Sequence, residues 1–449
     1  MPHESVHVDN RRSAGSSRGP SLSSPTTSAA EGSISAAARQ QARLSQANLP
    51  WYLRPKHAWE ELKVDAEGGV FAGTIPALIE RLLLEPLDTA PTQEQAYRTT
   101  FLTTYKSFTT ANIVYDTLIG YYKMEPPASL GPAEFLEWKE KRQRPTQTRV
   151  LSVLSQWVER HSMTIDDPQL IPQLRTFLGT VQTPTGQAIT ASQILQTMDR
   201  VARFLIRRNR QKAPKGEFLK WDSLEVANHL TIMETRAYNK IRPHECLSWT
   251  RSTTGPAVAN LTSFIGTSDR LAAWVKLSVL TCELLGKRAD TIDQWIKIAE
   301  HCRKQNNIFS MSAIVAALSG GDVGKLTLTW AHVSRASTFQ QLVKIMDPTG
   351  RFAAYKELHN SLDGPCVPFI SLFLTELMHI NDQFTDVIPT PTGPEPEQPA
   401  PRALINFSKL RRLSDVISIM LKFTNKPYRN LTENLGMTAA IEQQIEAAA

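Results

Sequence analysis

The sequence predicts an all-α protein with two helical domains, the second of which contains a long helical hairpin. Through most of the chain, apolar residues recur at the three- and four-residue spacing of amphipathic helices. No alternation of apolar and polar residues is long enough to predict a strand, and no repeat of fixed period occurs. With 449 residues, the chain exceeds what one hydrophobic core usually holds, which favours two or three domains.

Composition narrows the class of protein. The apolar fraction of 41% is sufficient for folded domains, and the net charge of +7 does not by itself indicate nucleic-acid binding. No apolar run approaches the roughly 20 residues that cross a bilayer, and the first 50 residues lack the apolar block of a signal peptide. We therefore expect a cytoplasmic protein. The four cysteines lack the spacing of a metal site, so we expect reduced thiols, no metal and no cofactor: Cys246, Cys282, Cys302 and Cys366.

Three segments precede the second domain. Residues 1–50 are poor in aromatic and large aliphatic side chains and predict a disordered tail. Residues 70–208 predict the first helical domain, with Thr74 capping one helix and Thr109 or Thr110 capping another. Within it, the stretch 139–149 is charged, contains Pro145 and is interpreted as a connection between helices.

The segment Arg200–Lys220 is strongly basic and is broken by Pro214 and Gly216, which indicates a domain boundary. One interpretation is a contact with an anionic membrane surface or an acidic protein. The other, which the pattern favours, is a solvated helix end and linker. No aromatic residues are interleaved with the basic ones, so we expect no nucleic-acid partner.

The second domain is predicted to span residues 218–445 and to contain longer, more apolar helices. Residues 271–284, 292–302 and 308–318 each predict a buried helix, and Gly320-Gly321 ends the third.

The most informative stretch is Pro365–Phe423, which predicts two helices joined by a long proline-rich loop. The first helix can start at Pro368, where the missing N–H costs nothing. In the second helix, Leu410, Leu413 and Ile417 repeat a buried pattern. One face of the first helix is predicted to be buried and carries Ile370, Phe373, Leu377, Ile380 and Phe384.

A separate stripe of the first helix carries Ser371, Thr375, Met378 and Asp382, which follow one another at spacings of four, three and four. On pattern alone, the stripe is interpreted as a solvated face with one stray methionine. Lys409, Arg411 and Arg412 of the second helix are expected to stay polar. The choice between a solvated face and a functional one depends on a resemblance described below.

Motifs for covalent or nucleotide chemistry are absent from the sequence. There is no G-x-x-x-x-G-K-[ST] loop, no G-x-G-x-x-G, no H-E-x-x-H and no G-x-S-x-G. The stretch Gly320–Lys325 lacks the spacing of a phosphate loop and is interpreted as a turn between helices. We therefore do not expect an enzyme with covalent chemistry.

Several ordered blocks resemble one known family. Pro365-Cys366-Val367-Pro368-Phe369, then Leu404–Lys409, then Pro427-Tyr428 are similar to the catalytic domain of Ras-family guanine-nucleotide exchange factors of the Son-of-sevenless type. Blocks at 222–245, 298–318 and 325–330 agree with the same domain in order. Phe101–Thr110 resembles the signature of the Ras exchanger motif, the helical domain that precedes the catalytic one. The resemblance covers about residues 70 to 440. It implies an N-terminal helical domain packed on a larger helical domain, from which the hairpin protrudes.

The resemblance implies a regulator that promotes GDP release from a Ras-like small GTPase of the Ras or Rap branch. In this family the hairpin opens the first switch segment and disturbs the magnesium and phosphate site. It implies catalytic roles for Met378, Asp382 and Thr375. It also implies GTPase contacts by six residues and hairpin support by four. The contacts are Phe352, Tyr355, Phe369, Ser371, His379 and Asn381; the supports are Leu377, Asn406, Phe407 and Lys409.

The family acts at the inner face of the plasma membrane, so recruitment from the cytoplasm is expected. Some positions depart from the family pattern. Asp382 stands where the longer Glu is common, Asn381 replaces a frequent acid, and Gly266 replaces a frequent arginine. The hairpin loop 386–402 is also long and proline-rich. These departures keep open an alternative, a scaffold that binds a Ras-family GTPase without accelerating exchange.

Overall fold

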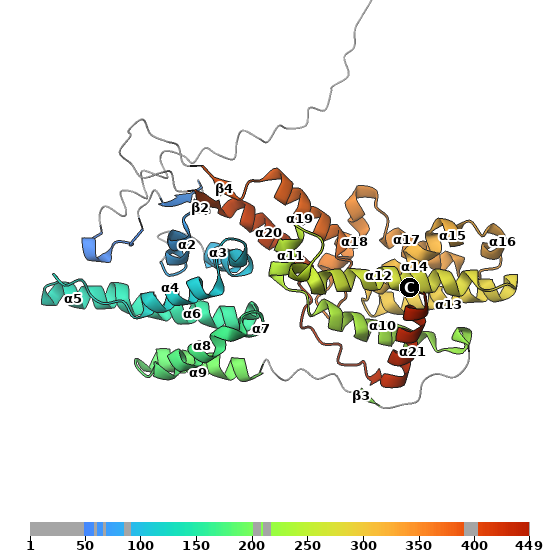
Figure 1. Cartoon of the computed structure of the whole chain (residues 1–449), viewed down its shortest axis with the longest axis horizontal. Coiled ribbons are helices and arrows are strands. Elements are labelled where there is room, and N and C mark those ends of the chain that lie inside the picture. The colour runs from blue at the N-terminus through green and yellow to red at the C-terminus, as the bar shows by residue number, and fades with distance from the viewer. Residues whose placement is uncertain are drawn as a thin grey trace, which may run out of the picture.

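The computed structural model describes residues 49–57, 61–65, 69–84, 91–200, 208–209, 217–389 and 403–448. Helices dominate these ranges, and the prediction of an all-α fold is confirmed. Figure 1 shows an N-terminal group of helices beside a larger C-terminal group. Residues 1–48, most of the basic segment Arg200–Lys220 and most of the proline-rich loop lie outside the described residues. Among the residues that are described, no helix is both long and apolar enough to cross a bilayer.

The N-terminal domain is a set of short and medium helices around an aromatic and aliphatic core. Thr74 caps its first helix by accepting a hydrogen bond from Ala77 N, and Thr110 caps another by accepting one from Ile113 N. Both caps were predicted. The helices are α2 (Ile75–Arg81), α3 (Pro91–Thr104), α4 (Ala111–Tyr122), α5 (Pro132–Trp138), α6 (Arg144–Arg160), α7 (Met163–Asp166), α8 (Ile171–Thr180) and α9 (Thr185–Arg200).

The interpretation of residues 139–149 as a connection is wrong. Residues Lys139–Gln143 form a π-helical turn that runs directly into α6. Pro145 lies in the first turn of α6, so the continuous helix lacks one backbone donor directly after the π-helical turn.

The C-terminal domain has long, buried helices at its centre. Phe264 of α12 stacks on Phe309 of α14 with ring centroids 4.1 Å apart, and Trp274 and Trp295 are fully buried nearby. Its helices are α10 (Ser223–Tyr238), α11 (Pro243–Trp249), α12 (Ala259–Leu280), α13 (Leu285–Lys304), α14 (Ile308–Ser319), α15 (Gly321–Gly324), α16 (Thr327–Trp330), α17 (Ala336–Ile345), α18 (Thr349–Ser361), α19 (Ser371–Gln383), α20 (Phe407–Met420) and α21 (Leu435–Ala448).

The sequence pattern missed two small sheets. One has the strand order β1-β2-β5-β4 and joins β1 (Leu62–Val64), β2 (Val70–Gly73), β5 (Leu404–Asn406) and β4 (Val387–Ile388), all antiparallel. The other pairs β3 (Arg208–Asn209) with β6 (Glu433–Asn434) in parallel. Strands of two to four residues are too short for a period of two to be seen in the sequence. The helical domain predicted from residue 70 onward therefore begins with a strand, β2.

The two domains meet where α3 crosses α20 (Figure 1). The ring of Tyr97 packs on the ring of Phe407 with centroids 4.8 Å apart, and both side chains are buried. Pairing of β2 with β5 adds backbone hydrogen bonds across the same junction. Asp166 Oδ1 and Arg242 Nε, 3.2 Å apart, form a further ion pair between the domains. The N-terminal domain thus braces the helical hairpin from one side.

Candidate functional site

The candidate site is the helical hairpin formed by α19 and α20. The chain entering it is held in place, because the N–H groups of Ile308 and Phe309 donate to Val367 O and Val367 N donates to Asn306 O. This pairing keeps the segment before α19 extended. As a result α19 begins at Ser371, three residues after the predicted start at Pro368.

The two faces of α19 differ as the spacing predicts. Leu377 and Ile370 are fully buried, and Phe373 is 4% exposed. On the other side, Thr375, Met378 and Asp382 are exposed, with Met378 at 39%. The Asp382 carboxylate forms no ion pair with any residue that the structure describes. The stripe therefore offers a thioether and a free carboxylate to a partner.

The tip of the hairpin is held by the buried amine of Lys409. Its Nζ donates to Asn381 O at 3.2 Å, to Asn381 Oδ1 at 2.9 Å and to Asp386 Oδ1 at 2.8 Å. This donor lowers the pKa of the Asp386 carboxyl. Lys409 was expected to stay polar and to support the hairpin, and its side chain is only 2% exposed. An ammonium can be buried here because three oxygen atoms replace its water.

Asn406 supports the same corner. It caps α20 by accepting a hydrogen bond from Lys409 N, and its Nδ2 donates to Thr385 O at 2.9 Å. The amide of Asn381 donates to Thr250 O at 3.3 Å in addition to accepting from Lys409. Asn381 was predicted to contact the GTPase, but its side chain is engaged within the molecule and ties α19 to the end of α11.

The aromatic residues before the hairpin have different exposures. Phe352 and Phe369 are half-buried, and their ring centroids lie 5.7 Å apart. Arg351 and Phe352 have positive φ values of 56° and 60°, which are uncommon for residues with a Cβ. This backbone turns Phe352 toward Phe369.

Tyr355 requires a correction. It was predicted to contact a GTPase, but it is 0% exposed and its Oη donates to Phe369 O at 3.1 Å. A fully buried ring can position Phe369 but cannot touch a partner in this arrangement. Of the other two predicted contacts, Ser371 is half-buried and His379 is exposed beside the stripe.

A pocket of about 550 Å³, which no pattern in the sequence predicted, lies beside these aromatic residues. Phe352 and Phe369 form one part of its wall. The rest comes from α12, α14 and α17 with the turn after it, including Ser268, Ser312, Ala313, Val343 and Met346. Four separate chain segments must meet to form the pocket, so no local pattern in the sequence could have revealed it.

A second group that sequence reasoning missed is a buried polar network beneath the site. Glu234 of α10 accepts a hydrogen bond from Ser310 Oγ, and Asn307 Nδ2 donates to Ser310 Oγ and to Thr231 Oγ1. Burial raises the pKa of Glu234 to about 7. The network fixes the loop between α13 and α14, on which Val367 is anchored. Within the described ranges, no three His, Cys, Asp or Glu side chains are placed to hold a metal ion.

Comparison with known proteins agrees with this geometry. The family model of the RasGEF domain matches residues 225–411, and that of the RasGEF N-terminal motif matches residues 70–177. The chain belongs to the Ras guanine-nucleotide exchange factor family. All of α19 lies inside the match to the RasGEF domain, and Tyr97 lies inside the match to the N-terminal motif. Both matches fall within the predicted domains 70–208 and 218–445, whose exact ends stay a prediction.

Curated relatives of this exchange-factor family match most of the chain. Cell division control protein 25 of Candida albicans is 25% identical over 406 residues, covering 85% of this chain and 29% of that protein. Cell division control protein 25 of Saccharomyces cerevisiae is 26% identical over 425 residues, covering 85% and 26%. Guanine nucleotide exchange factor SDC25 of Saccharomyces cerevisiae is 27% identical over 434 residues, covering 90% and 34%. The chain thus spans about a third or less of the length of these relatives.

Proposed function

We propose that this chain promotes release of GDP from a Ras-like small GTPase, of the Ras or Rap branch. One observation supports this function above the others. The α19 helix is buried on the face that carries Leu377, and its opposite face carries the exposed Met378 and the carboxylate of Asp382, which forms no ion pair with a described residue. The hairpin that presents them is braced on two sides, by α3 of the N-terminal domain and by the end of α11. A helix that must displace a segment of its partner protein has to be held rigidly in this way.

In the proposed mechanism, α19 enters beside the nucleotide and displaces the first switch segment of the GTPase. Met378 brings an apolar thioether toward the magnesium site, where it supplies no ligand and excludes water. Asp382 brings negative charge toward the phosphate-binding loop, where it repels phosphate and accepts the hydrogen bonds that the phosphate had used. Thr375 lies on the same stripe, one turn before Met378, and extends the contact.

The energy required is within reach of such a contact. Each tenfold gain in release rate corresponds to about 1.4 kcal/mol of barrier. An increase of several powers of ten in the release rate therefore requires the barrier to fall by roughly 5–8 kcal/mol, which a few well-placed interface residues can supply. The exchange factor favours neither nucleotide; the more abundant nucleotide reloads after release.

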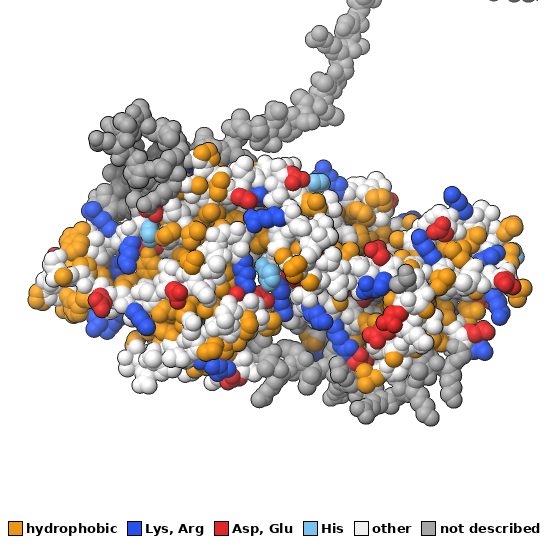
Figure 2. Space-filling view, viewed as in Figure 1, with side chains coloured by type: hydrophobic (Ala, Val, Ile, Leu, Met, Phe, Trp, Pro, Cys, Tyr) orange, Lys and Arg blue, Asp and Glu red, His pale blue; other side chains and the backbone are white. Residues whose placement is uncertain are grey.

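The rest of the partner surface is proposed to include the pocket beside Phe352 and Phe369. Its apolar wall can take a hydrophobic side chain of the GTPase, while Ser371 and His379 offer polar groups on the exposed side of α19. Tyr355 acts behind this surface as a positioning residue. Charged side chains of both signs are intermixed over the face of the molecule that Figure 2 shows. Recruitment from the cytoplasm to an anionic membrane would use the basic segment Arg200–Lys220, the N-terminal tail or a partner protein.

The second candidate is a scaffold that binds a GTPase without accelerating exchange. The internal hydrogen bonds of the Asn381 amide favour it, since this side chain is then not available to contact the partner. A nucleotide-release panel separates the two functions. The chain is mixed with GTPases of the Ras and Rap branches, each loaded with fluorescent GDP, and binding is measured in parallel. Faster release from at least one GTPase supports the proposed function, and binding without faster release supports the scaffold. If the chain neither binds a GTPase nor accelerates release, both functions are refuted.

A further inference from the structure

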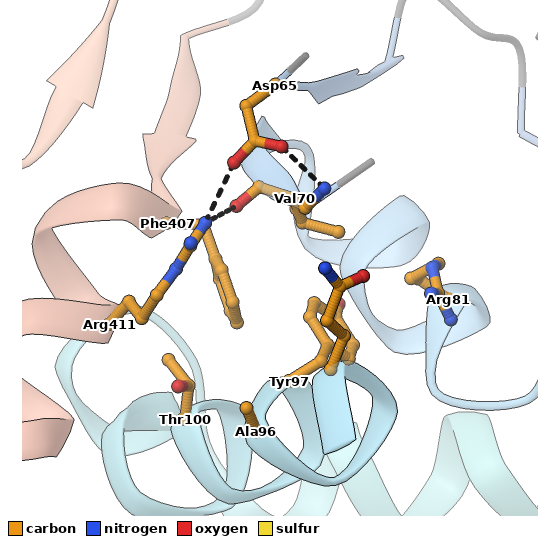
Figure 3. Close-up of a pocket in the computed structure, with 10 residues that line it drawn as sticks. Asp65, Val70, Arg81, Ala96, Tyr97, Thr100, Phe407 and Arg411 are labelled. Carbon is orange, nitrogen blue, oxygen red and sulfur yellow. Dashed lines mark hydrogen bonds and ion pairs between the residues drawn. The ribbon is translucent and has the colours of Figure 1, made fainter. Parts of the chain in front are cut away.

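A second pocket lies at the junction of the two domains, away from the exposed stripe. It has a volume of about 310 Å³, which is at the lower end of the range for small-molecule sites. One wall comes from the N-terminal domain, through the turn between β1 and β2 and through α2 and α3. The other wall is Phe407 and Arg411 of α20 (Figure 3). Domain interfaces are a preferred location for such sites.

The charge of the lining favours an anion. Its charged side chains are Arg81, Arg411 and Asp65, two cations and one anion. Arg81 is held by Glu94 at 3.0 Å. Arg411 is held more loosely: its Nη2 lies 3.4 Å from Asp65 Oδ2 and 3.0 Å from Val70 O, and its side chain is 41% exposed. A carboxylate entering the pocket can therefore replace Asp65 on Arg411.

The floor of the pocket favours a flat, apolar body with one polar contact. The rings of Tyr97 and Phe407 form the buried pair, and the Tyr97 hydroxyl donates a hydrogen bond to Leu78 O. Thr100 is 2% exposed and lines the pocket, yet its hydroxyl has no hydrogen-bond partner among the described residues. A hydroxyl that lines the pocket and forms no hydrogen bond with a described residue is available to a ligand as donor or acceptor.

We propose that this junction pocket binds a small aromatic carboxylate of one ring. The ring packs on Tyr97 and Phe407, and the carboxylate accepts hydrogen bonds from Arg411 and Thr100. Because its walls belong to two domains, the bound molecule favours the arrangement in which α3 and α20 are docked. A metabolite bound in this pocket would thus stabilise the contact between α3 and α20, which supports the hairpin.

The test uses benzoate as the probe on the full chain, with benzyl alcohol as the uncharged control and acetate as the control without a ring. Saturation-transfer NMR measures binding, and the unfolding temperature measures stabilisation. A single-ring ligand is expected to bind at about 1–10 mM. We expect benzoate to bind and to raise the unfolding temperature, and each control compound to do less.

Two substitutions with opposite predicted effects on benzoate binding distinguish direct contact with the ligand from disruption of the contact between the two domains. Arg411→Gln removes the charged donor and should weaken benzoate binding about tenfold. Asp65→Asn removes the competing anion and keeps an acceptor for Gly69 N, so binding should tighten about threefold. If Arg411 and Asp65 acted only through the brace, both substitutions would weaken binding.

A third variant tests the location. Ala96 is exposed at the rim, and Ala96→Phe should block entry without disturbing the core. Loss of benzoate binding in this variant supports the proposal. The proposal is overturned if benzoate does not bind the wild-type chain, if benzyl alcohol binds equally well, or if all three variants bind like the wild type.

Discussion

Nζ of Lys409 lies 2.9 Å from Oδ1 of Asn381, joining the first turn of α20 to the last turn of α19. The same amine reaches the Asn381 carbonyl and Asp386, so one buried charge holds three oxygen atoms at the tip of the hairpin. The residue before Asp382 is thereby fixed to the second helix. The position of the exposed carboxylate depends on this contact.

Lys409→Met should lower stability and slow exchange. The substitution keeps much of the side-chain volume but leaves the oxygen atoms of Asn381 and Asp386 without their donor, at a cost of about 1–3 kcal/mol. Urea unfolding measures the loss. Lys304→Met is the matched control, since that side chain is 64% exposed and pairs only within α13. Equal effects of the two substitutions would contradict the role assigned to Lys409.

Leu377→Asp should destabilise the C-terminal domain severely, by about 4 kcal/mol or more, because it buries a charge without a partner. The neighbouring Glu376 is exposed, and Glu376→Ala should change the free energy of unfolding by less than about 0.5 kcal/mol. Thermal unfolding of both variants checks the assignment of the two faces of α19. A stable Leu377→Asp protein would mean that this face is not buried in solution.

Tyr97 and Phe407 should be energetically coupled across the domain junction. A double-mutant cycle with Tyr97→Leu and Phe407→Leu is expected to give a coupling energy of about 0.5–1.5 kcal/mol. Chemical unfolding of the four proteins supplies the numbers. Strictly additive effects would show that the N-terminal domain does not brace α20 through this pair.

Glu234 should make stability fall as pH rises. Its pKa is about 7 in the folded protein, above its ordinary value of 4.5, so the folded state keeps a proton that the unfolded state has lost. The stabilisation is fully present below about pH 4.5 and is lost as pH rises through 7, a change of about 3 kcal/mol. Glu234→Gln should remove this dependence between pH 5 and 8. The exposed Glu283→Gln should keep the wild-type profile, and a profile unchanged in Glu234→Gln would contradict the assignment.

The sequence alone is sufficient to predict that the fold is helical and which residues lie on each face of α19. Helical spacing alone separates Leu377 from Met378 and Asp382, because a period of 3.6 residues puts them on different faces. The start of α19 was misplaced because Val367 is held by the loop at Asn306, far away in the chain.

Other misses have the same origin. The local pattern around the charged Lys409 does not predict its burial, which depends on the three oxygen atoms that folding brings to its amine. The exposure of Tyr355 was mispredicted because its hydrogen bond to Phe369 and the covering helices are tertiary features. The junction between Tyr97 and Phe407 joins residues from two domains, and no local pattern encodes such a contact.

The most direct measurement is nucleotide release from the GTPase that responds to this chain, with the stripe altered. Met378→Ala combined with Asp382→Ala should slow release about a hundredfold, roughly 2.7 kcal/mol of barrier, while the unfolding temperature stays unchanged. Glu376→Ala, a carboxylate removed from the same helix off the stripe, should leave the rate unchanged. Wild-type release rates in the double variant, or equal slowing by Glu376→Ala, would contradict the account.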